Sequence, residues 1–342
     1  MKRCVDKRVI LFLSLLIVVV SLFLANLFWG SVNIPCKDVL SILLGGECER
    51  EAWKLIVLET RLPQAVTALL TGAAISVAGL LLQTLFNNPL AGPEVLGINS
   101  GAGLGVAVVM LLMQGMFVAG GMGVAGYLAV FAGAFIGAAV IIMIILFLSS
   151  VLKNKVFLLI VGVAVGYLAS SLISVLNYFA TSEGVHSYLI WGMGSFSAVS
   201  MEQLPLYAVL TLVLIAVSLF MMKPLNALLL GDAYAHNLGV NVRAVRSVLL
   251  AVTGLLTAVV TAFCGPIAFL GLAIPHIARL FFKTNNHKIL LPATLLSGAA
   301  VALLCNTVCQ LPGENGLLPL GAITPLIGAP VIIYVVLKNK NL

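Results

Sequence analysis

Long uninterrupted apolar runs recur along the chain and are separated by short polar segments. An α-helix rises about 1.5 Å per residue, so about 20 apolar residues cross the roughly 30 Å hydrocarbon core of a bilayer. The continuous runs disfavour a β-barrel, whose strands alternate apolar and polar residues. We therefore predict an all-α membrane protein, with a single transmembrane domain over residues 1–342. About ten transmembrane helices are predicted: Val9–Trp29, Leu62–Leu82, Val95–Met113, Tyr127–Leu148, Val156–Tyr178, Leu204–Met222, Ser247–Cys264, Ile267–Phe282, Ile289–Cys309 and Pro319–Leu337.

Composition points the same way. Hydrophobic residues make up 62% of the 342 residues and charged residues only 8%, whereas soluble domains carry about 25% charged residues. The mean hydropathy is +1.19. A water-soluble fold of this size would lack the polar surface to cover itself, so lipid is the expected solvent for most of the chain.

The distribution of charge orients the predicted spans. With the N-terminus inside, the cytoplasmic segments hold 3 of the 11 acids, namely Asp6, Glu94 and Asp232. They hold 14 of the 18 bases: Lys2, Arg3, Lys7, Arg8, Lys153, Lys155, Lys223, Arg243, Arg246, Arg279, Lys283, Lys288, Lys338 and Lys340. The positive-inside rule then predicts that both termini are cytoplasmic.

The first apolar run follows Lys2, Arg3, Lys7 and Arg8, as the apolar region of a signal peptide would. The run is too long for such a region, and Asn26–Trp29 lacks a small-residue cleavage pattern. We therefore expect this run to be a retained first span.

The inner segment 223–246 predicts two short helices. Leu225–Leu230 forms one short helical turn, which Gly231 breaks. A second helix covers Ala233–Leu238, with Asp232 as its N-cap and Gly239 as its C-cap. A helix pair on the basic side can dock a cytosolic partner, and a passive amphipathic connector has the same pattern.

Signatures of catalysis are absent from the sequence. The chain contains no G-x-x-x-x-G-K-[ST], H-E-x-x-H or G-x-S-x-G, and its six cysteines include no C-x-x-C. We therefore expect no enzyme activity, catalytic residue, metal site or cofactor. Cys305 and Cys309 lie one helical turn apart and fit apolar packing. Cys36 and Cys48 share the outer loop, where a disulfide is one of two open alternatives.

The predicted spans carry almost no charge. Ion-coupled carriers keep ionisable groups at mid-membrane depth, so this pattern argues against the alternative of a stand-alone ion-coupled secondary transporter. It indicates that energy comes from another protein. The spans instead carry small-residue faces, which pack helices closely within one chain or form a sliding or dimer interface. Two such faces are Gly97-x-x-x-Gly101-x-Gly103-x-Gly105 and Gly133-x-x-x-Gly137.

A faint internal repeat is also present. Gly92-Pro93 precedes Leu96-Gly97, and Gly265-Pro266 precedes Leu270-Gly271. The first Gly-Pro pair is predicted on the cytoplasmic side and the second on the outer side. Inverted-topology repeats leave this pattern in transporters, and chance produces Gly-Pro pairs as well.

Several motifs follow one another along nearly the whole chain. They are Arg61-Leu62-Pro63 with Gly79-x-x-x-Gln83 and Asn87-Asn88-Pro89-Leu90-Ala91-x-Pro93-x-x-Leu96-Gly97; Trp191-Gly192-x-Gly194; Leu230-Gly231-Asp232 with Ala235 and Leu238-Gly239-Val240; Gly265-Pro266-Ile267-x-Phe269-Leu270-Gly271-Leu272-x-Ile274-Pro275-His276-Ile277-x-Arg279; and Leu320-Gly321-x-Ile323-Thr324-x-x-Ile327-Gly328-Ala329-Pro330. In this order, and with ten spans, they resemble the permease subunits of type II ABC importers for ferric siderophores, haem and cobalamin. The match is specific as to family and does not distinguish the cargo.

The resemblance implies a homodimer in the bacterial cytoplasmic (inner) membrane, with two cytosolic ABC ATPase subunits and an extracytoplasmic substrate-binding protein, and no nucleic acid. It implies a translocation path for a metal chelate along the dimer axis, lined mainly by the fifth and tenth spans. The family pattern places ATPase coupling at Gly231, Asp232, Ala235, Leu238 and Gly239. It places binding-protein docking at Arg61, to which we add the outer bases Lys54 and Arg50 as candidates, and the cytoplasmic gate region at Asn154, Lys155 and Val156.

Some positions depart from the family pattern. Gln64 stands where relatives usually have Arg. Near the end of the ninth span, Asn306 and Gln310 stand where they usually have Asp and Arg, and Leu317 stands for a Glu. The docking surface is therefore expected to depend on Arg61, or on Lys54 and Arg50, more than in relatives. Lys155 and Val156 replace small hydroxylated residues at the gate.

Overall fold

A computed structural model describes residues 2–112, 124–152, 154–311 and 316–339. Within these ranges the chain is helical and contains no strand. The α-helices are α1 (Lys2–Phe28), α2 (Cys36–Leu43), α3 (Glu51–Leu55), α4 (Leu62–Phe86), α5 (Ile98–Ala107), α6 (Val124–Val151), α7 (Lys155–Phe179), α8 (Ser182–Gly192), α9 (Leu204–Phe220), α10 (Met222–Leu228), α11 (Asp232–Asn237), α12 (Val242–Cys264), α13 (Leu270–Phe282), α14 (His287–Cys309) and α15 (Leu320–Asn339). The π-helices η1 (Ile56–Arg61) and η3 (Val108–Leu112) and the 3-10 helices η2 (Pro93–Leu96) and η4 (Phe196–Ala198) complete the elements.

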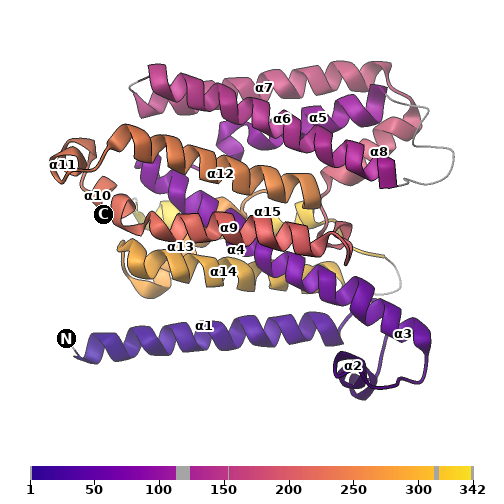
Figure 1. Ribbon diagram of the computed structural model, residues 1–342. Coiled ribbons are helices and arrows are strands. Elements are labelled where there is room, and N and C mark those ends of the chain that lie inside the picture. Colours follow the sequence, from indigo (N-terminus) through magenta and orange to yellow (C-terminus); the bar gives the residue numbers. More distant parts are fainter. Residues whose placement is uncertain (1, 113–123, 153, 312–315, 340–342) are drawn as a thin grey trace.

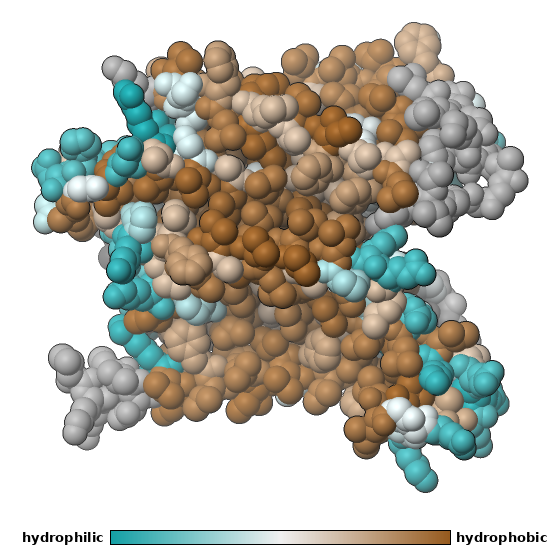
Figure 2. Space-filling view, viewed as in Figure 1, coloured by the Kyte–Doolittle hydropathy of each residue, from teal (hydrophilic) through white to brown (hydrophobic). Residues whose placement is uncertain are grey.

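The long helices lie side by side in one bundle (Figure 1). α1 lies along one edge, α6 and α7 lie along the opposite edge, and α4 crosses the middle. Helices α2 and α3 gather at one end, whereas α10, α11 and both chain ends gather at the other. The two chain ends therefore share a side, as the charge distribution predicts. Figure 2 shows a broad apolar band between hydrophilic residues at the two ends.

The spans agree with the predicted number. In the described ranges, six helices are long and apolar enough to cross a bilayer, and the pair α9–α10, bent by 52°, adds a seventh. Three shorter apolar helices, Ile98–Leu111, Leu270–Phe282 and Leu320–Val335, supply the others. The prediction of an all-α membrane protein is confirmed, and the number of apolar helices is roughly consistent with about ten spans. The predicted end of the third span at Met113 and most of the Gly-rich stretch that follows it lie outside the described residues.

The bundle is built around α4, whose residues are almost all buried. Close helix crossings explain its glycines. A Cβ on Gly72 would lie 2.2 Å from the carbonyl oxygen of Gly298 in α14, and one on Gly79 would lie 1.7 Å from that of Gly271 in α13. Both distances are far below van der Waals contact. These positions therefore require glycine for the helices to pack as they do.

The predicted small-residue faces on α5 and α6 meet each other. A Cβ on Gly105 would lie 1.8 Å from the carbonyl oxygen of Gly133, and one on Gly137 would lie 2.1 Å from that of Gly101. Of the two interpretations left open by the sequence, packing within the chain accounts for these glycines.

The two Gly-Pro segments of the faint repeat lie closer than their predicted locations on opposite sides would allow. Glu94 Oε1 accepts a hydrogen bond from the backbone N–H of Phe269 at 2.7 Å. The reason is that α5 and α13 are short: the 13 residues of α13 extend about 20 Å, less than a bilayer's hydrocarbon core. Each helix begins just after a residue in the left-handed conformation, Gly97 (φ 72°) or Phe269 (φ 68°). The two segments thus turn toward each other inside the protein.

The outer loop packs around a small apolar cluster of its own, formed by Ile34, Val39, Ile42 and Val57. Cys36 and Cys48 are free thiols in this loop, and Cys48 Sγ donates to the carbonyl oxygen of Arg50 at 3.1 Å. Of the two alternatives for this cysteine pair, the structure has the reduced one.

Candidate functional site at the cytoplasmic end

The predicted coupling segment consists of α10 and α11, separated by Gly231 at φ 96°. Gly239, at φ 82°, follows α11. Its N–H donates to the carbonyl oxygen of His236 at 2.9 Å, and the N–H of Val240 donates to that of Ala235 at 3.0 Å. These two bonds form a Schellman motif, which ends a helix through a left-handed glycine. The prediction that Gly239 ends the second helix is confirmed, although Leu238 occupies the formal C-cap position.

The interpretation of Asp232 as an N-cap is wrong. The N-cap of α11 is Gly231, and no side chain caps the helix. The Asp232 carboxylate instead lies 2.8 Å from Lys155 Nζ and 3.5 Å from Arg246 Nη2. Because two bases approach the carboxylate from other helices, it forms ion pairs and does not bind the N–H groups of its own helix.

The family pattern places Ala235 among the residues that couple to the ATPase, and a residue that contacts a partner must be accessible. Ala235 is 0% exposed and lies inside the chain's own core. Its helix packs against α10 and α12, so Ala235 provides the close approach of α11 to the bundle. Direct contact with a partner through this side chain is therefore excluded in this structure. Apolar side chains around α11 that do face outward are Leu230, Tyr234 and Leu238, which are 61%, 54% and 57% exposed.

The predicted gate region forms the start of α7. Asn154 is the N-cap of this helix, and its side chain accepts the N–H of Val156 at 2.8 Å. Val156 is exposed, and Lys155 forms the ion pair with Asp232. This ion pair thus joins the predicted gate region to the predicted coupling segment, two sites that the sequence did not connect.

Hydrogen bonds through Asn226 hold α10 to the bundle. Asn226 Oδ1 accepts the backbone N–H of His287 in α14 at 2.8 Å. The ring of His287 also lies 3.0 Å from Asn226 Oδ1 through Nδ1, and 2.8 Å from Thr84 Oγ1 of α4 through Nε2. α10 is therefore tied to α4 and α14, whereas α11 is tied to α7 and α12.

The residues of the first and fourth sequence motifs bind one another. Arg279 Nη1 donates to Gln83 Oε1 at 2.6 Å, and Gln83 Nε2 donates to the carbonyl oxygen of Leu272 at 3.1 Å. His276 Nε2 donates to the carbonyl oxygen of Pro89 at 2.8 Å. A cavity of about 240 Å³ lies beside these residues. The contacts show that these motif residues hold α13 to the last turn of α4 and to the segment after it, and that His276 is a hydrogen-bonded packing residue.

At the outer end, Arg61 is 4% exposed. Its Nη1 donates to the carbonyl oxygens of Leu27 (2.9 Å) and Phe28 (3.1 Å), and its Nη2 donates to that of Val32. These carbonyls include the last two of α1, so Arg61 caps that helix at the end where a positive charge is favourable. In this structure the guanidinium of Arg61 is bound by its own chain, and its expected role in docking a binding protein stays a prediction. No sequence signal distinguished the capping role from the docking one.

The other two predicted docking residues are accessible. Arg50 and Lys54 are both exposed at the outer end. The guanidinium carbon of Arg50 lies over the ring of Trp53, 5.3 Å from its centre. This stacking orders the Arg50 side chain while its charge stays accessible.

Three departures from the family pattern lie together. Gln64 Nε2 donates to Asn306 Oδ1 at 2.9 Å, and Gln310 Nε2 donates to Gln64 Oε1 at 3.3 Å. Asn306 Nδ2 in turn donates to Asn26 Oδ1 of α1 at 2.6 Å. All four side chains are buried. They form one neutral amide network between α1, α4 and the end of α14.

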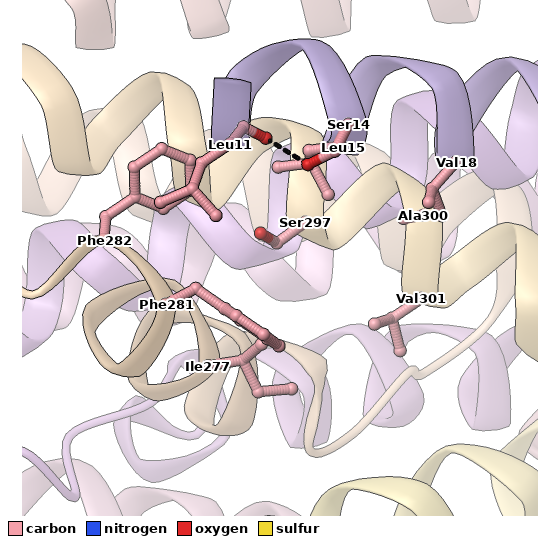
Figure 3. Close-up of a pocket in the computed structure, with 10 residues that line it drawn as sticks. All are labelled: Leu11, Ser14, Leu15, Val18, Ile277, Phe281, Phe282, Ser297, Ala300 and Val301. Atoms are coloured by element: carbon pink, nitrogen blue, oxygen red, sulfur yellow. Dashed lines mark hydrogen bonds between the residues drawn. The ribbon is translucent and has the colours of Figure 1, made fainter. Parts of the chain in front are cut away.

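An apolar cavity of about 310 Å³ lies between α1, α13 and α14. Figure 3 shows that hydrophobic side chains surround it, and that Ser14 bonds back to its own helix. Ser14 and Ser297 are the polar side chains that line it. The cavity therefore offers no groups to bind a charged chelate.

Comparisons with known proteins agree with this architecture. The family model of the FecCD transport family matches residues 15–338. The vitamin B12 import system permease protein BtuC of Escherichia coli O9:H4 (strain HS) is 37% identical over 332 residues, covering 92% of this chain and 97% of the relative. The protein of the same name from Shigella sonnei (strain Ss046) is 37% identical over 329 residues, covering 92% and 96%.

Solved structures are similar as well. A putative metal-chelate type ABC transporter in an inward-facing conformation has a TM-score of 0.83 and 27% identity, covering 96% of this chain and 99% of that one. PsaBC from Streptococcus pneumoniae shares only the fold, with a TM-score of 0.50 and 15% identity over 80% and 90% of the two chains. The chain is a multi-pass permease of the bacterial cytoplasmic membrane with the fold of ABC importer permeases, and it belongs to the FecCD transport family.

Proposed function

We propose that this chain forms, as a homodimer, the translocation path of an ATP-driven importer for a metal chelate of the ferric siderophore, haem or cobalamin type. Two cytosolic ABC ATPase subunits supply the energy, and an extracytoplasmic binding protein delivers the cargo. Residues 1–342 then form one transmembrane permease domain, with residues 223–246 as its coupling segment. Cobalamin is the first cargo to test, because relatives with 37% identity are named vitamin B12 permeases.

The observation that carries the proposal is the apolar surface at the cytoplasmic end. Leu230, Tyr234 and Leu238 are more than half exposed on or beside a short helix outside the spans. Exposed apolar clusters in such a place mark protein interaction sites. Because the chain has no phosphate-binding loop of its own, an ATPase subunit is the partner that this surface fits.

The surfaces of α7 and α15 support a path between two copies. Both helices present large exposed apolar side chains, among them Tyr167, Tyr178, Leu326 and Ile333. The described residues of these two helices carry no charge apart from Lys155 and Lys338 at their cytoplasmic ends. A weakly polar path of this kind has few groups to select a cargo, which leaves selection to the binding protein. Arg50 and Lys54 are the outer bases that we assign to its docking.

Transport by the whole complex in proteoliposomes tests the proposal. Uptake of cobalamin, haem and a ferric siderophore is compared with and without ATP. We expect the complex to take up one of the three, and to do so only when ATP is present. The double variant Tyr234→Asp with Leu238→Asp is expected to lose both the ATPase and uptake. Leu44→Asp, at an exposed leucine of the opposite end, is the control that keeps both. Uptake driven by an ion gradient without ATP would support a secondary transporter instead.

A further inference from the structure

The Asp232 carboxylate connects three helices at the cytoplasmic end. Asp232 is the first residue of α11, Lys155 is the first residue of α7, and Arg246 lies in the first turns of α12. The carboxylate oxygens lie 2.8 Å from Lys155 Nζ and 3.5 Å from Arg246 Nη2. In the described part of the chain, these are the two ion pairs present. The coupling helix is therefore joined by charge to the helix that carries the predicted gate.

The two bases depend on this carboxylate. Both side chains are largely buried, and Arg246 Nε has no hydrogen-bond partner in the described structure. Without Asp232, two partly desolvated positive charges would face each other with no counter-ion, and like charges at short range repel. Removing the carboxylate is thus expected to separate the start of α7 from α11, and not only to loosen a surface contact.

The remaining contacts of α7 are of another kind. This helix packs on α5, α6 and η2, and much of its length is exposed. The ion pair between Lys155 and Asp232 is therefore the charged contact that joins the start of α7 to the coupling segment. α10, by contrast, is fixed to α4 and α14 through Asn226 and His287. A movement of α11 about the anchored α10 would pull on the start of α7.

We propose that Asp232 is a positioning residue whose ion pair with Lys155 transmits movement of α11 to the cytoplasmic end of α7. This inference rests on the proposed function and specifies how the coupling segment acts on the gate. The Asp232 carboxylate pairs with two bases of the permease itself, so its replacement is expected to leave the ATPase bound. A charge-assisted contact that differs between two states changes their ratio by about tenfold or more.

The test measures cargo uptake and ATP hydrolysis together in proteoliposomes of the whole complex, with radiolabelled cyanocobalamin, haem and a ferric siderophore as the probes. Asp232→Asn and Lys155→Gln are expected to retain the ATPase and its hydrolysis. Uptake per ATP hydrolysed is expected to fall by about tenfold. Lys155→Arg keeps the charge and is expected to restore most of this ratio. Arg243→Gln removes an exposed base of the same segment, which has no ion pair in the described structure, and serves as the matched control.

Four results would contradict the proposed role of the Asp232–Lys155 ion pair. An unchanged ratio of uptake to hydrolysis in Asp232→Asn would overturn the inference. Loss of the bound ATPase would overturn it too, because Asp232 would then belong to the docking surface. Equal losses of uptake in Lys155→Arg and Lys155→Gln would show a structural role and not a transmitted charge contact. Failure of the proposed function would appear in the wild-type complex, as absent ATP-dependent uptake, and the inference would fall with it.

Discussion

Replacing Gly79 by alanine tests the helix crossing at the centre of the bundle. The added Cβ would lie 1.7 Å from the carbonyl oxygen of Gly271 and 2.4 Å from its carbonyl carbon. Both contacting groups are backbone, so no side chain can rotate away. To reach ordinary contact, α4 and α13 must separate by about 1.5 Å, and gaps of 0.5–1 Å already forfeit about a quarter to a half of each dispersion contact.

The magnitude follows from two opposing effects. Overpacking of a tight interior costs about 1–3 kcal/mol, and the upper end applies here because helices have to move. Alanine recovers about 1 kcal/mol through its better helix propensity. We therefore expect a net loss of about 2 kcal/mol, roughly a 30-fold change in the folding equilibrium, together with reduced transport.

The assay is equilibrium unfolding of the purified permease in mixed micelles, followed by circular dichroism. Gly192→Ala is the matched control, because a Cβ on Gly192 meets no atom within 4 Å. Because alanine is also the better helix former at this position in α8, the control is expected to be as stable as the wild type or up to about 1 kcal/mol more stable. If Gly79→Ala and Gly192→Ala unfold together with the wild type, the argument that the crossing requires glycine is refuted.

Four further predictions concern the outer end. Arg61→Ala should destabilise the permease more than Arg50→Ala in the same unfolding assay, since it leaves three carbonyls without their donor; equal effects would contradict the capping role. Arg50→Glu with Lys54→Glu should weaken association of the binding protein more at low than at high salt, and an affinity unchanged at both would place docking elsewhere. Asn306→Leu should cost about 1–3 kcal/mol for each buried amide left unpaired, and an unaltered unfolding curve would count against the network. An impermeant maleimide applied to spheroplasts should label the exposed Cys36 and spare Cys4, and the reverse would invert the topology.

The sequence predicted the features that depend on periodicity and on local turn chemistry. Apolar runs of about 20 residues located the spans, and Gly231 and Gly239 bounded the second coupling helix because their left-handed backbone favours glycine. Shorter helices were predicted with less accuracy. The third and eighth spans begin inside the protein, where Gly97 and Phe269 redirect the chain, and an apolar run does not reveal that a helix starts late.

Side-chain partners far apart in sequence were not predictable. Asp232 and Lys155 are separated by 77 positions, and the capping preference of aspartate suggested a local role for Asp232. The family pattern placed Ala235 among the residues that couple to the ATPase, whereas its side chain is buried in the chain's own bundle. Arg61 illustrates the same limit, since a base at the end of a span serves equally well as a docking charge or as a helix cap until its neighbours are known.

The amide network explains why the departures from the family pattern occur together. Gln64, Asn306 and Gln310 are far apart in sequence, yet their side chains are bonded to one another and buried. If relatives carry charges at these positions, neutralising one alone would leave a buried charge without its partner, which costs about 3–5 kcal/mol. Amides at all three positions avoid that cost and hydrogen-bond to one another. The neutral network carries no charge for docking a binding protein, which is why we assign that role to the exposed bases Arg50 and Lys54.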